Sequence, residues 1–451
     1  MFVVGGGGTG SEVAFSLGRA GGLTVGIAER DKLGGECNHY GCVPTKAMLA
    51  SAKVAATARG AGRYGVRVPS VEVDFPAVID RVRRIIDSQS GEGPKPFEEQ
   101  GIRVFLQEAR LVGPHRVELA DGTQVEAGRI VLATGSDAMV PAIDGLQDGP
   151  FWTNKEAIWS ATAVPSSLAV IGSGPIGLEF AQVYSRFGAT VSVVELAGRI
   201  LPGEDDESSA AILEALEAEG ISLMCDTTSC RASHGPDGWQ IDFEDDQHVH
   251  AEQLLMAIGR RPVFEVHDLA AAGVELNERG WPVLDEQLRT TADGIWAAGD
   301  ATGELLFTHV GTYEAELVVD DILGRPRTRD YRVVPRVTFT EPEVGSVGLT
   351  EAAARDAGHE VVTSFTRFDD NERAHLEGHA FGMVKLVADA GTGELLGGHI
   401  VGQGAGEMIH QVVVAMAGRV PARVIADTIH AYPTLSESLR TAFSELAGKL
   451  E

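Results

Sequence analysis

Residues 2–21 read FVVGGGGTGSEVAFSLGRAG, and residues 23–30 continue as LTVGIAER. The apolar run predicts a short buried strand, and the glycines after it predict a tight turn that opens a helix. The second strand ends in an acid that lies 24 residues beyond the first glycine of the turn. This order of strand, G-x-G-x-x-G turn and helix is typical of a dinucleotide-binding unit. The residues that carry the pattern are Gly5, Gly7, Gly10 and Glu29.

The same pattern returns later in the chain. Residues 167–188 read SLAVIGSGPIGLEFAQVYSRFG, and residues 189–196 continue as ATVSVVEL. In this copy the acid follows the first glycine by 23 residues. The corresponding residues are Gly172, Gly174, Gly177 and Glu195. Because a lone glycine motif is weak evidence, the repetition of the whole arrangement is what predicts two dinucleotide sites.

Each glycine of such a motif has its own physical task. The first makes the turn, the second lets the backbone approach a pyrophosphate, and the third lets the helix pack on the strand. The free N–H groups and partial positive charge of the helix N-terminus favour the phosphates. The acid at the end of the second strand accepts hydrogen bonds from ribose hydroxyls. Both copies therefore predict a bound nucleotide.

Three further segments complete the predicted fold. RIVLATGS around Gly135 and QLLMAIGRRP around Gly259 each add a strand to one unit, and TTADGIWAAGD adds another that ends at Asp300. Beyond about residue 331, alternating strands with a DAGTG turn predict an antiparallel sheet, followed by helices over 407–417 and 436–450. The predicted class is α/β, with two Rossmann-like dinucleotide-binding domains and a C-terminal α+β domain.

Length, charge and cysteine content narrow the function. A chain of 451 residues is long enough for about three domains. Its net charge of -28 would repel nucleic acid and anionic lipid, so neither is an expected partner. No signal peptide or run of apolar residues long enough to span a bilayer is visible. The four cysteines are too few for a disulfide scaffold, which favours a cytoplasmic location.

Residues 34–46 read GGECNHYGCVPTK and contain a closely spaced cysteine pair, Cys37 and Cys42. The spacing places the two sulfurs about one helical turn apart, close enough for a small disulfide ring. A helix that continues through Lys46 would place its positive end near the thiols and stabilise a thiolate. A zinc site that includes His39 is the alternative, but no second ligand pair completes a tetrahedron, so we predict no metal site. Cys225 and Cys230 lack such a setting, and we expect a strand cysteine and a loop cysteine there.

Taken together, these motifs resemble the flavoprotein disulfide reductases, a family that includes dihydrolipoamide dehydrogenase, glutathione reductase and mercuric reductase. GGECNHYGCVPTK, both dinucleotide motifs, ATGS, AIGRRP, GIWAAGD and HAYPTLSES occur in the family's order and span essentially the whole chain. The resemblance implies a homodimer. It also implies four parts, which are an FAD domain over 1–145, an NAD domain over 146–270, a central segment over 271–330 that completes the FAD domain, and an interface domain over 331–451.

The resemblance also assigns roles to individual residues. Cys37 resembles the interchange thiol that meets substrate, and Cys42 the charge-transfer thiol over the flavin. Lys46 resembles the lysine near the flavin, and Glu179 its ion-pair partner close to the nicotinamide. The implied FAD-binding residues are Gly5, Gly7, Gly10, Glu29, Gly135 and Asp300, and the implied NAD-binding residues are Gly172, Gly174, Gly177, Glu195 and Gly259.

The nicotinamide preference depends on the end of one strand. Glu195 suits a free ribose 2'-hydroxyl and repels a 2'-phosphate. Family members that use NADPH usually carry arginines just after this strand, whereas here a single arginine follows, at Arg199. The sequence therefore favours NAD(H) over NADP(H).

The chain departs from the family at its C-terminal motif. Thiol-reactive members have His-Pro-Thr-x-x-Glu, in which the His is the acid/base, but here Tyr432 precedes Pro433 and Glu437 keeps the last position. A phenol, with an ordinary pKa of about 10, is a poor proton acceptor from a thiol at neutral pH. His430 could replace the missing imidazole only if the backbone moved, and we expect it to be structural. A second departure is Glu36, which we expect to slow ionisation of the neighbouring Cys37.

These observations leave two enzymatic interpretations. The first is an FAD-dependent, NAD(P)H-linked disulfide oxidoreductase similar to dihydrolipoamide dehydrogenase. The second is an NAD(P)H-dependent reductase of quinones or metal ions, which needs no thiol base. Mercuric reductases normally add a C-terminal cysteine pair that residues 445–451, ELAGKLE, do not contain. A non-catalytic flavin sensor is disfavoured by the cysteine pair. The expected acceptor is thus a small molecule or a disulfide.

Overall fold

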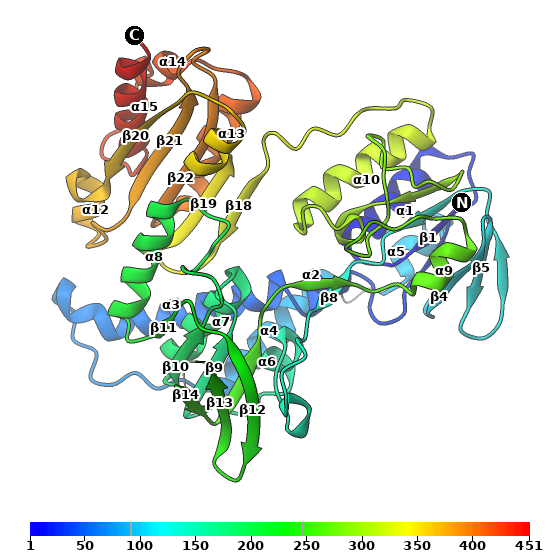
Figure 1. The fold of residues 1–451 in the computed structure, drawn as a ribbon, viewed down its shortest axis with the longest axis horizontal. Helices are drawn as coiled ribbons and strands as arrows, with labels where there is room; N and C mark the ends of the chain where they lie inside the picture. The colour runs from blue at the N-terminus through cyan, green and yellow to red at the C-terminus, as the bar shows by residue number, and fades with distance from the viewer. Residues whose placement is uncertain (91–92, 245–246) are drawn as a thin grey trace.

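The computed structural model describes residues 1–90, 93–244 and 247–451. Figure 1 shows three lobes, with the C-terminal helices and sheet in one, the N-terminal strands in another and the second glycine motif in the third. The α/β class is confirmed, because the two glycine motifs lie in parallel sheets and the C-terminal lobe is an antiparallel sheet packed with helices.

The first glycine motif lies in a parallel five-stranded sheet of order β17-β7-β1-β2-β3. Three fully buried residues, Phe2, Val3 and Val4, form its central strand, as an apolar run with helices on both faces requires. Helices α1 (Gly8–Ala20) and α10 (Thr308–Ile322) pack against each other beside this sheet. The strands are β1 (Phe2–Val4), β2 (Gly26–Ala28), β3 (Arg103–Phe105), β7 (Ile130–Leu132) and β17 (Ile295–Ala297).

Other elements pack either against this sheet or against the second glycine-motif unit. The cysteine motif forms the short helix α2 (Gly35–His39) and the start of the long helix α3 (Cys42–Arg59). The turn η1 (Gly60–Tyr64) and helices α4 (Phe75–Ser90) and α5 (Lys95–Glu98) follow. A small antiparallel sheet contains β4 (Ala109–Gly113), β5 (Arg116–Leu119) and β6 (Gln124–Glu126), and α9 (Val266–Ala271) and η3 (Gly299–Thr302) complete this part.

The second glycine motif repeats the architecture in a parallel four-stranded sheet of order β11-β10-β9-β15. Its strands are β9 (Ser167–Ile171), β10 (Thr190–Val194), β11 (Ser222–Met224) and β15 (Gln253–Met256). Its helices are α6 (Asn154–Trp159), α7 (Pro175–Phe187) and α8 (Asp206–Ala218). A three-stranded antiparallel sheet of β12 (Ser229–Gly235), β13 (Gly238–Phe243) and β14 (His248–Ala251) lies beside it. Cys225 follows β11 and Cys230 lies within β12, which reverses the expected strand and loop positions.

Two chain crossings join these parallel sheets. Strand β8 (Ser136–Ala138) leaves the first sheet and, after the turn η2 (Leu146–Asp148), leads to the second. Strand β16 (Arg260–Pro262) leads back, and it pairs antiparallel with β8. The crossings therefore lie side by side at the junction of the two nucleotide-binding units.

The C-terminal lobe is an antiparallel five-stranded sheet of order β18-β19-β22-β21-β20. Its strands are β18 (Pro335–Thr338), β19 (Glu343–Gly348), β20 (Val361–Arg367), β21 (Met383–Asp389) and β22 (Leu395–Gly402). The predicted helices are confirmed as α13 (Ala405–Ala417) and α15 (Ser436–Leu450). The remaining elements are α11 (Glu351–Asp356), η4 (Phe368–Asp370), α12 (Glu372–Leu376) and α14 (Ala422–Asp427).

Candidate functional site

The cysteine pair spans a break between two helices. Gly34 and Gly35 adopt φ of 95° and 61°, which a glycine tolerates, and they turn the chain into α2. Cys37 lies in α2 and Cys42 begins α3, so both cysteines are held by helix backbone. The two thiols are hydrogen-bonded to each other, and Thr308 Oγ1 lies 3.8 Å from Cys42 Sγ.

This contact makes the two thiols unequal. The hydrogen bond from Cys37, aided by the positive charge of Lys46 and opposed by burial, lowers the pKa of Cys42 to about 6. The same hydrogen bond, together with burial, raises the pKa of Cys37. These opposite pKa directions favour the thiolate at Cys42 and the protonated thiol at Cys37.

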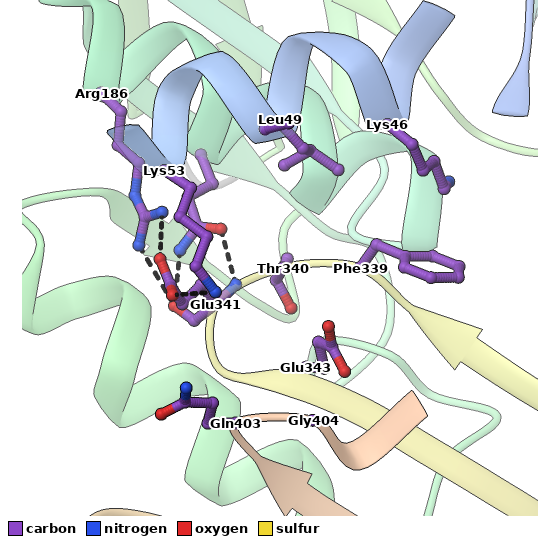
Figure 2. Close-up of a pocket in the computed structure, with 12 residues that line it drawn as sticks. Lys46, Leu49, Lys53, Arg186, Phe339, Thr340, Glu341, Glu343, Gln403 and Gly404 are labelled. Carbon is purple, nitrogen blue, oxygen red and sulfur yellow. Dashed lines mark hydrogen bonds and ion pairs between the residues drawn. The ribbon is translucent and has the colours of Figure 1, made fainter. Parts of the chain in front are cut away.

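Lys46 and Glu179 form a short ion pair beside the cysteines. Lys46 Nζ lies 2.6 Å from Glu179 Oε2, and the Glu179 side chain is only 3% exposed. The other carboxylate oxygen of Glu179 accepts the Phe339 N–H at 3.0 Å. Figure 2 shows the Lys46 ammonium above the ring of Phe339, whose centroid is 4.7 Å away. Three separate parts of the chain therefore hold this pair.

Next to this ion pair lies a cavity of about 170 Å³. At its other end, in Figure 2, Glu341 is paired with Lys53 at 2.8 Å and with Arg186 at 2.7 Å. Glu343 lies between the two ends, and burial raises the pKa of this carboxyl. Most charges in the cavity wall are thus already paired within the protein.

The first glycine turn fits an FAD pyrophosphate. A Cβ on Gly10 would lie 1.9 Å from Gly5 O, so the helix can pack there only on glycine. On the outer side, a Cβ on Gly8 would meet nothing within 4 Å and one on Gly7 only a Cα at 3.9 Å. The turn is thus closed toward the sheet and open where phosphates would approach the start of α1.

The second turn has the same construction. A Cβ on Gly177 would lie 2.0 Å from Gly172 O, while one on Gly174 would meet nothing within 4 Å. Glu195 accepts hydrogen bonds from Ser173 N at 2.9 Å and Ala197 N at 2.8 Å. This geometry fits a second dinucleotide.

The two acids hold their turns in matching ways. Glu29 accepts from Gly6 N at 2.7 Å and from Asp31 N at 2.8 Å, as Glu195 does in its own unit. A carboxylate oxygen has more than one lone pair, so each acid can still accept a ribose hydroxyl. The repeated hydrogen bonds make the two sites structural copies.

Asp300 lies where the first sheet meets the crossings. Its Oδ2 accepts the Ser136 hydroxyl at 2.5 Å, and Arg260 Nε lies 3.6 Å from the same oxygen. Gly135, with φ of 73°, directly precedes β8, and Gly259, with φ of 128°, directly precedes β16. The predicted FAD residues Gly135 and Asp300 are thus brought together, while Gly259 lies beside the same junction.

Glu36, the acid before Cys37, lies among polar and positively charged side chains. Its carboxylate accepts Asn154 Nδ2 at 2.8 Å and lies 3.7 Å from Lys155 Nζ and 3.6 Å from Arg260. Two cations therefore lie close to the Glu36 carboxylate and oppose the effect of its negative charge on Cys37. The sequence could have indicated Arg260 through the GRRP segment, but no local signal marks Asn154 or Lys155.

Tyr432 and Glu437 lie in the C-terminal lobe. Tyr432 is 71% exposed in the single chain, and Glu437 Oε2 accepts Thr434 N at 3.1 Å. His430 Nδ1 lies 3.0 Å from Thr428 O. Glu437 thus stabilises the start of α15 through a backbone contact.

Within residues 1–90, 93–244 and 247–451, no group of three or more His, Cys, Asp or Glu side chains is arranged to hold a metal ion. His39 Nε2 instead lies 2.9 Å from Leu33 O. No helix in these ranges is long and apolar enough to cross a bilayer.

Comparisons with known proteins agree with this architecture. Residues 1–315 match the family described as pyridine nucleotide-disulphide oxidoreductase, and residues 334–443 match its dimerisation domain. Dihydrolipoyl dehydrogenase of Chlorobaculum parvum is 36% identical, over 99% of this chain and 97% of that protein. Mercuric reductase of Streptomyces lividans is also 36% identical, over 97% and 94%.

The solved structures give the same result. The Cu(II) complex of the HOCl-induced flavoprotein disulfide reductase RclA from Escherichia coli has a TM-score of 0.89 and 28% identity, over 98% of this chain and 99% of that one. Matches to both family profiles and to full-length relatives identify the fold, the FAD and NAD cofactors and the reaction class. The chain belongs to the pyridine nucleotide-disulphide oxidoreductase family and is an FAD-dependent enzyme of that class.

Proposed function

We propose that this enzyme is an NADH-driven reductase in which the Cys37–Cys42 pair passes electrons to a thiol-binding metal ion. The observation that carries this proposal is Tyr432, which occupies the acid/base position of the C-terminal motif. A metal ion takes electrons from thiolates without needing a proton from a side chain. The missing imidazole therefore costs this reaction little.

The reaction balances in two half-reactions. NADH, a proton and the disulfide give NAD⁺ and the dithiol. The dithiol and two Cu(II) ions then give the disulfide, two Cu(I) ions and two protons. FAD, when bound, would supply the two-electron redox chemistry that links NADH oxidation to disulfide reduction.

The chain's own residues support these steps. Gly5, Gly7, Gly10 and Glu29 would bind the FAD pyrophosphate and ribose, with Gly135 and Asp300 nearby. NAD(H) would be bound by Gly172, Gly174, Gly177, Glu195 and Gly259.

At the redox pair, Cys42 would face the flavin as thiolate, and Cys37 would bind the acceptor. The pKa of Cys42 is lowered mainly by the hydrogen bond from Cys37, and this makes the Cys42 thiolate available at neutral pH. Lys46 would neutralise charge that develops near the flavin, and buried Glu179 fixes the position of Lys46.

Two comparisons support a metal-ion acceptor. One full-length relative is named mercuric reductase, and one structural neighbour was solved as a Cu(II) complex. A metal ion thus appears in the name of one similar protein and in the solved complex of another, and both proteins match this chain over nearly its whole length. A thiolate pair is a suitable ligand for soft or borderline metal ions.

Dihydrolipoamide oxidation is the second candidate. Glu437 retains its motif position, and the Chlorobaculum relative is named dihydrolipoyl dehydrogenase. A dithiol substrate must lose protons as it becomes a disulfide, and a phenol at position 432 is a poor base for this at neutral pH. We therefore rank this reaction below metal-ion reduction.

The assembly is proposed to be a homodimer, which the match to the dimerisation domain supports. We also propose that the chain divides at about residues 145, 270 and 330 into FAD, NAD, central and interface parts. Sparse cysteine usage is the basis for proposing a cytoplasmic location.

The deciding experiment compares acceptors with FAD-loaded protein. We expect NADH-dependent reduction of Cu(II) to exceed NAD⁺-dependent oxidation of dihydrolipoamide at least about tenfold, and Cys37→Ser to abolish the copper reaction. Cys230→Ser is the matched control, since Cys230 is exposed and lies outside the site. A faster dihydrolipoamide reaction, or copper reduction that survives Cys37→Ser, would contradict the proposal. Equal turnover of a quinone by the Cys37 variant would show that quinone reduction bypasses the pair.

A further inference from the structure

Five side chains of alternating charge form a row across the junction of the two nucleotide-binding units. Lys155 Nζ lies 2.9 Å from Asp137 and 3.7 Å from Glu36. Arg260 then lies 3.6 Å from Glu36 and 3.6 Å from Asp300. We call Asp137, Lys155, Glu36, Arg260 and Asp300 the charge row. Glu36 is its centre and the only acid between the two cations.

The charge row connects different parts of the chain. Asp137 lies on β8 and Arg260 on β16, the paired strands that cross between the two sheets. Lys155 lies in the first turn of α6, the first helix after the outward crossing, and Asp300 lies in η3, just after β17 of the first sheet. Glu36 directly precedes Cys37 in α2. The row therefore joins the redox helix to both crossings.

Neutral contacts reinforce this connection. Asn154 Nδ2 donates to Glu36 Oε1 at 2.8 Å and to Tyr40 O at 2.7 Å. Trp159 Nε1, from the other end of α6, donates to His39 O at 2.8 Å. Because α2 has only five residues, its own hydrogen bonds cannot hold it firmly. Its position thus depends on its neighbours, and α6 contributes these side-chain hydrogen bonds.

Arg260 is fixed from a second side. Its guanidinium donates to Ser136 Oγ at 2.6 Å and to Ser136 O at 2.7 Å, and its side chain is 13% exposed. An arginine anchored in this way presents its remaining N–H groups in a fixed direction. Glu36 therefore meets a pre-positioned cation on one side and Asn154 with Lys155 on the other.

We propose that Glu36 is a positioning residue that locks the Cys37 helix to the interdomain crossings and so maintains the thiol–thiol contact with Cys42. The proposal rests on the redox roles of Cys37 and Cys42 given above. Without the acid, Lys155 keeps only Asp137 and Arg260 keeps only Asp300, so no ion pair joins the two cations to α2. The row would be broken at its centre, and the Asn154 and Trp159 hydrogen bonds to backbone carbonyls would be what still ties α2 to α6.

The consequence at the cysteines has a definite sign. Groups that face Cys42 are Cys37 from α2, Lys46 from its own helix, Glu179 from α7 and the hydroxyl of Thr308 from α10. The Cys37 hydrogen bond is the largest cause of the low pKa of Cys42, so displacing Cys37 raises that pKa. Removal of an acid by itself would lower the pKa of a nearby thiol. The two effects are opposite and can be told apart.

The test uses FAD-loaded enzyme reduced anaerobically with dithionite. The long-wavelength absorbance of a thiolate against flavin is measured across pH, which gives an ionisation midpoint. We expect Glu36→Thr and the charge-neutral change Asn154→Ala both to raise this midpoint by about half a pH unit or more, a threefold change in the ionisation equilibrium. Glu72→Thr, which removes an exposed acid outside the charge row, should leave the midpoint unchanged.

Each outcome has one meaning. An unchanged or lowered midpoint in Glu36→Thr and Asn154→Ala would overturn the positioning role. If these variants lose FAD, the same midpoint is measured in Glu36→Gln, which keeps an acceptor for Asn154. A raised midpoint in Glu36→Gln supports the positioning role, and an unchanged or lowered midpoint overturns it. If the unmodified enzyme shows no thiolate absorbance after reduction, the proposed roles of the cysteines are wrong instead.

Discussion

Lys46 Nζ lies 2.6 Å from Glu179 Oε2, although 133 residues separate the two in the chain. Lys46 projects from α3, one turn after Cys42, and Glu179 projects from the second turn of α7, two residues after the last glycine of the second motif. Helix α3 and the second nucleotide-binding unit thus meet in one ion pair, whose acid is buried. Its charge balance acts directly on Cys42.

The two partners should shift the thiolate in opposite directions. The positive charge of Lys46 lowers the pKa of Cys42 and the negative charge of Glu179 raises it. We expect Lys46→Met to raise the ionisation midpoint of Cys42 and Glu179→Gln to lower it, each by about half a pH unit. The measurement is thiolate absorbance against pH in the reduced enzyme. Shifts of the same sign would show that misfolding dominates over charge.

Tyr432→His should increase dithiol chemistry. An imidazole can accept a thiol proton at neutral pH, and Glu437 occupies the position that orients it in related motifs. We expect at least about a tenfold gain in kcat/KM for dihydrolipoamide with NAD⁺, with copper reduction little changed. Tyr432→Phe is the control and should show no gain. No increase in the His variant would indicate that this position does not limit thiol chemistry.

Glu195→Gln should relax the choice of nicotinamide. Glu195 accepts Ser173 N and Ala197 N, and a glutamine can retain one acceptor oxygen while losing the charge that repels a 2'-phosphate. We expect the ratio of kcat/KM for NADPH over NADH to rise about tenfold, or about 1.4 kcal/mol. Glu29→Gln, the matching change in the first unit, should leave this ratio unaltered. An unchanged ratio in Glu195→Gln would contradict the assignment.

Lys385→Met should weaken the attachment of the C-terminal lobe. The Lys385 ammonium is 4% exposed and contacts Asp205 at 2.8 Å, Glu207 at 2.5 Å and Glu351 at 2.7 Å. Removal of the cation leaves the buried acid Asp205 without its ion-pair partner, which costs about 3 to 5 kcal/mol. Urea unfolding measures the loss, and Lys449→Met on the exposed face of α15 is the control. A loss equal to that of the control would contradict a central role for Lys385.

Glu314 makes the unfolding free energy depend on pH, because its carboxyl group is buried. Burial, only partly offset by hydrogen bonds from Tyr331 and Gly299 N, raises the pKa of Glu314 from 4.5 to about 7. Because the folded state favours protonated Glu314, this group adds on the order of 3 kcal/mol to the unfolding free energy below pH 4.5. That contribution is lost as the pH rises through about 7.

Glu314→Gln should remove this dependence. We expect the difference in unfolding free energy between the two proteins to change between pH 5 and pH 8, in the direction that favours the variant at pH 8. Thermal unfolding at both pH values checks it. A difference that is constant across this range would show that Glu314 is not protonated in the folded enzyme at pH 5.

Much of the fold could be predicted because its signals are local. The run Phe2-Val3-Val4 and the glycines after it specify a buried strand, a turn and a helix within about twenty residues, and the second motif repeats them. The requirement for glycine at Gly10 and Gly177 is equally local, since the contact that excludes a side chain lies within the same turn. The ends of strands have weak sequence signals. For this reason Cys225, expected in a strand, lies just after one, and Cys230, expected in a loop, lies within a strand.

The sequence by itself determined the cofactor-binding turns, the cysteine spacing and the loss of the usual histidine at Tyr432. Only the tertiary structure decided the surroundings of Glu36. Its neighbours Lys155 and Arg260 lie 119 and 224 residues away in sequence, and no pattern links them to the cysteine motif. Electrostatic effects depend on distance in space rather than along the chain. The sequence therefore shows Glu36 only as a negative charge next to Cys37, whereas the structure also shows the two cations beside it.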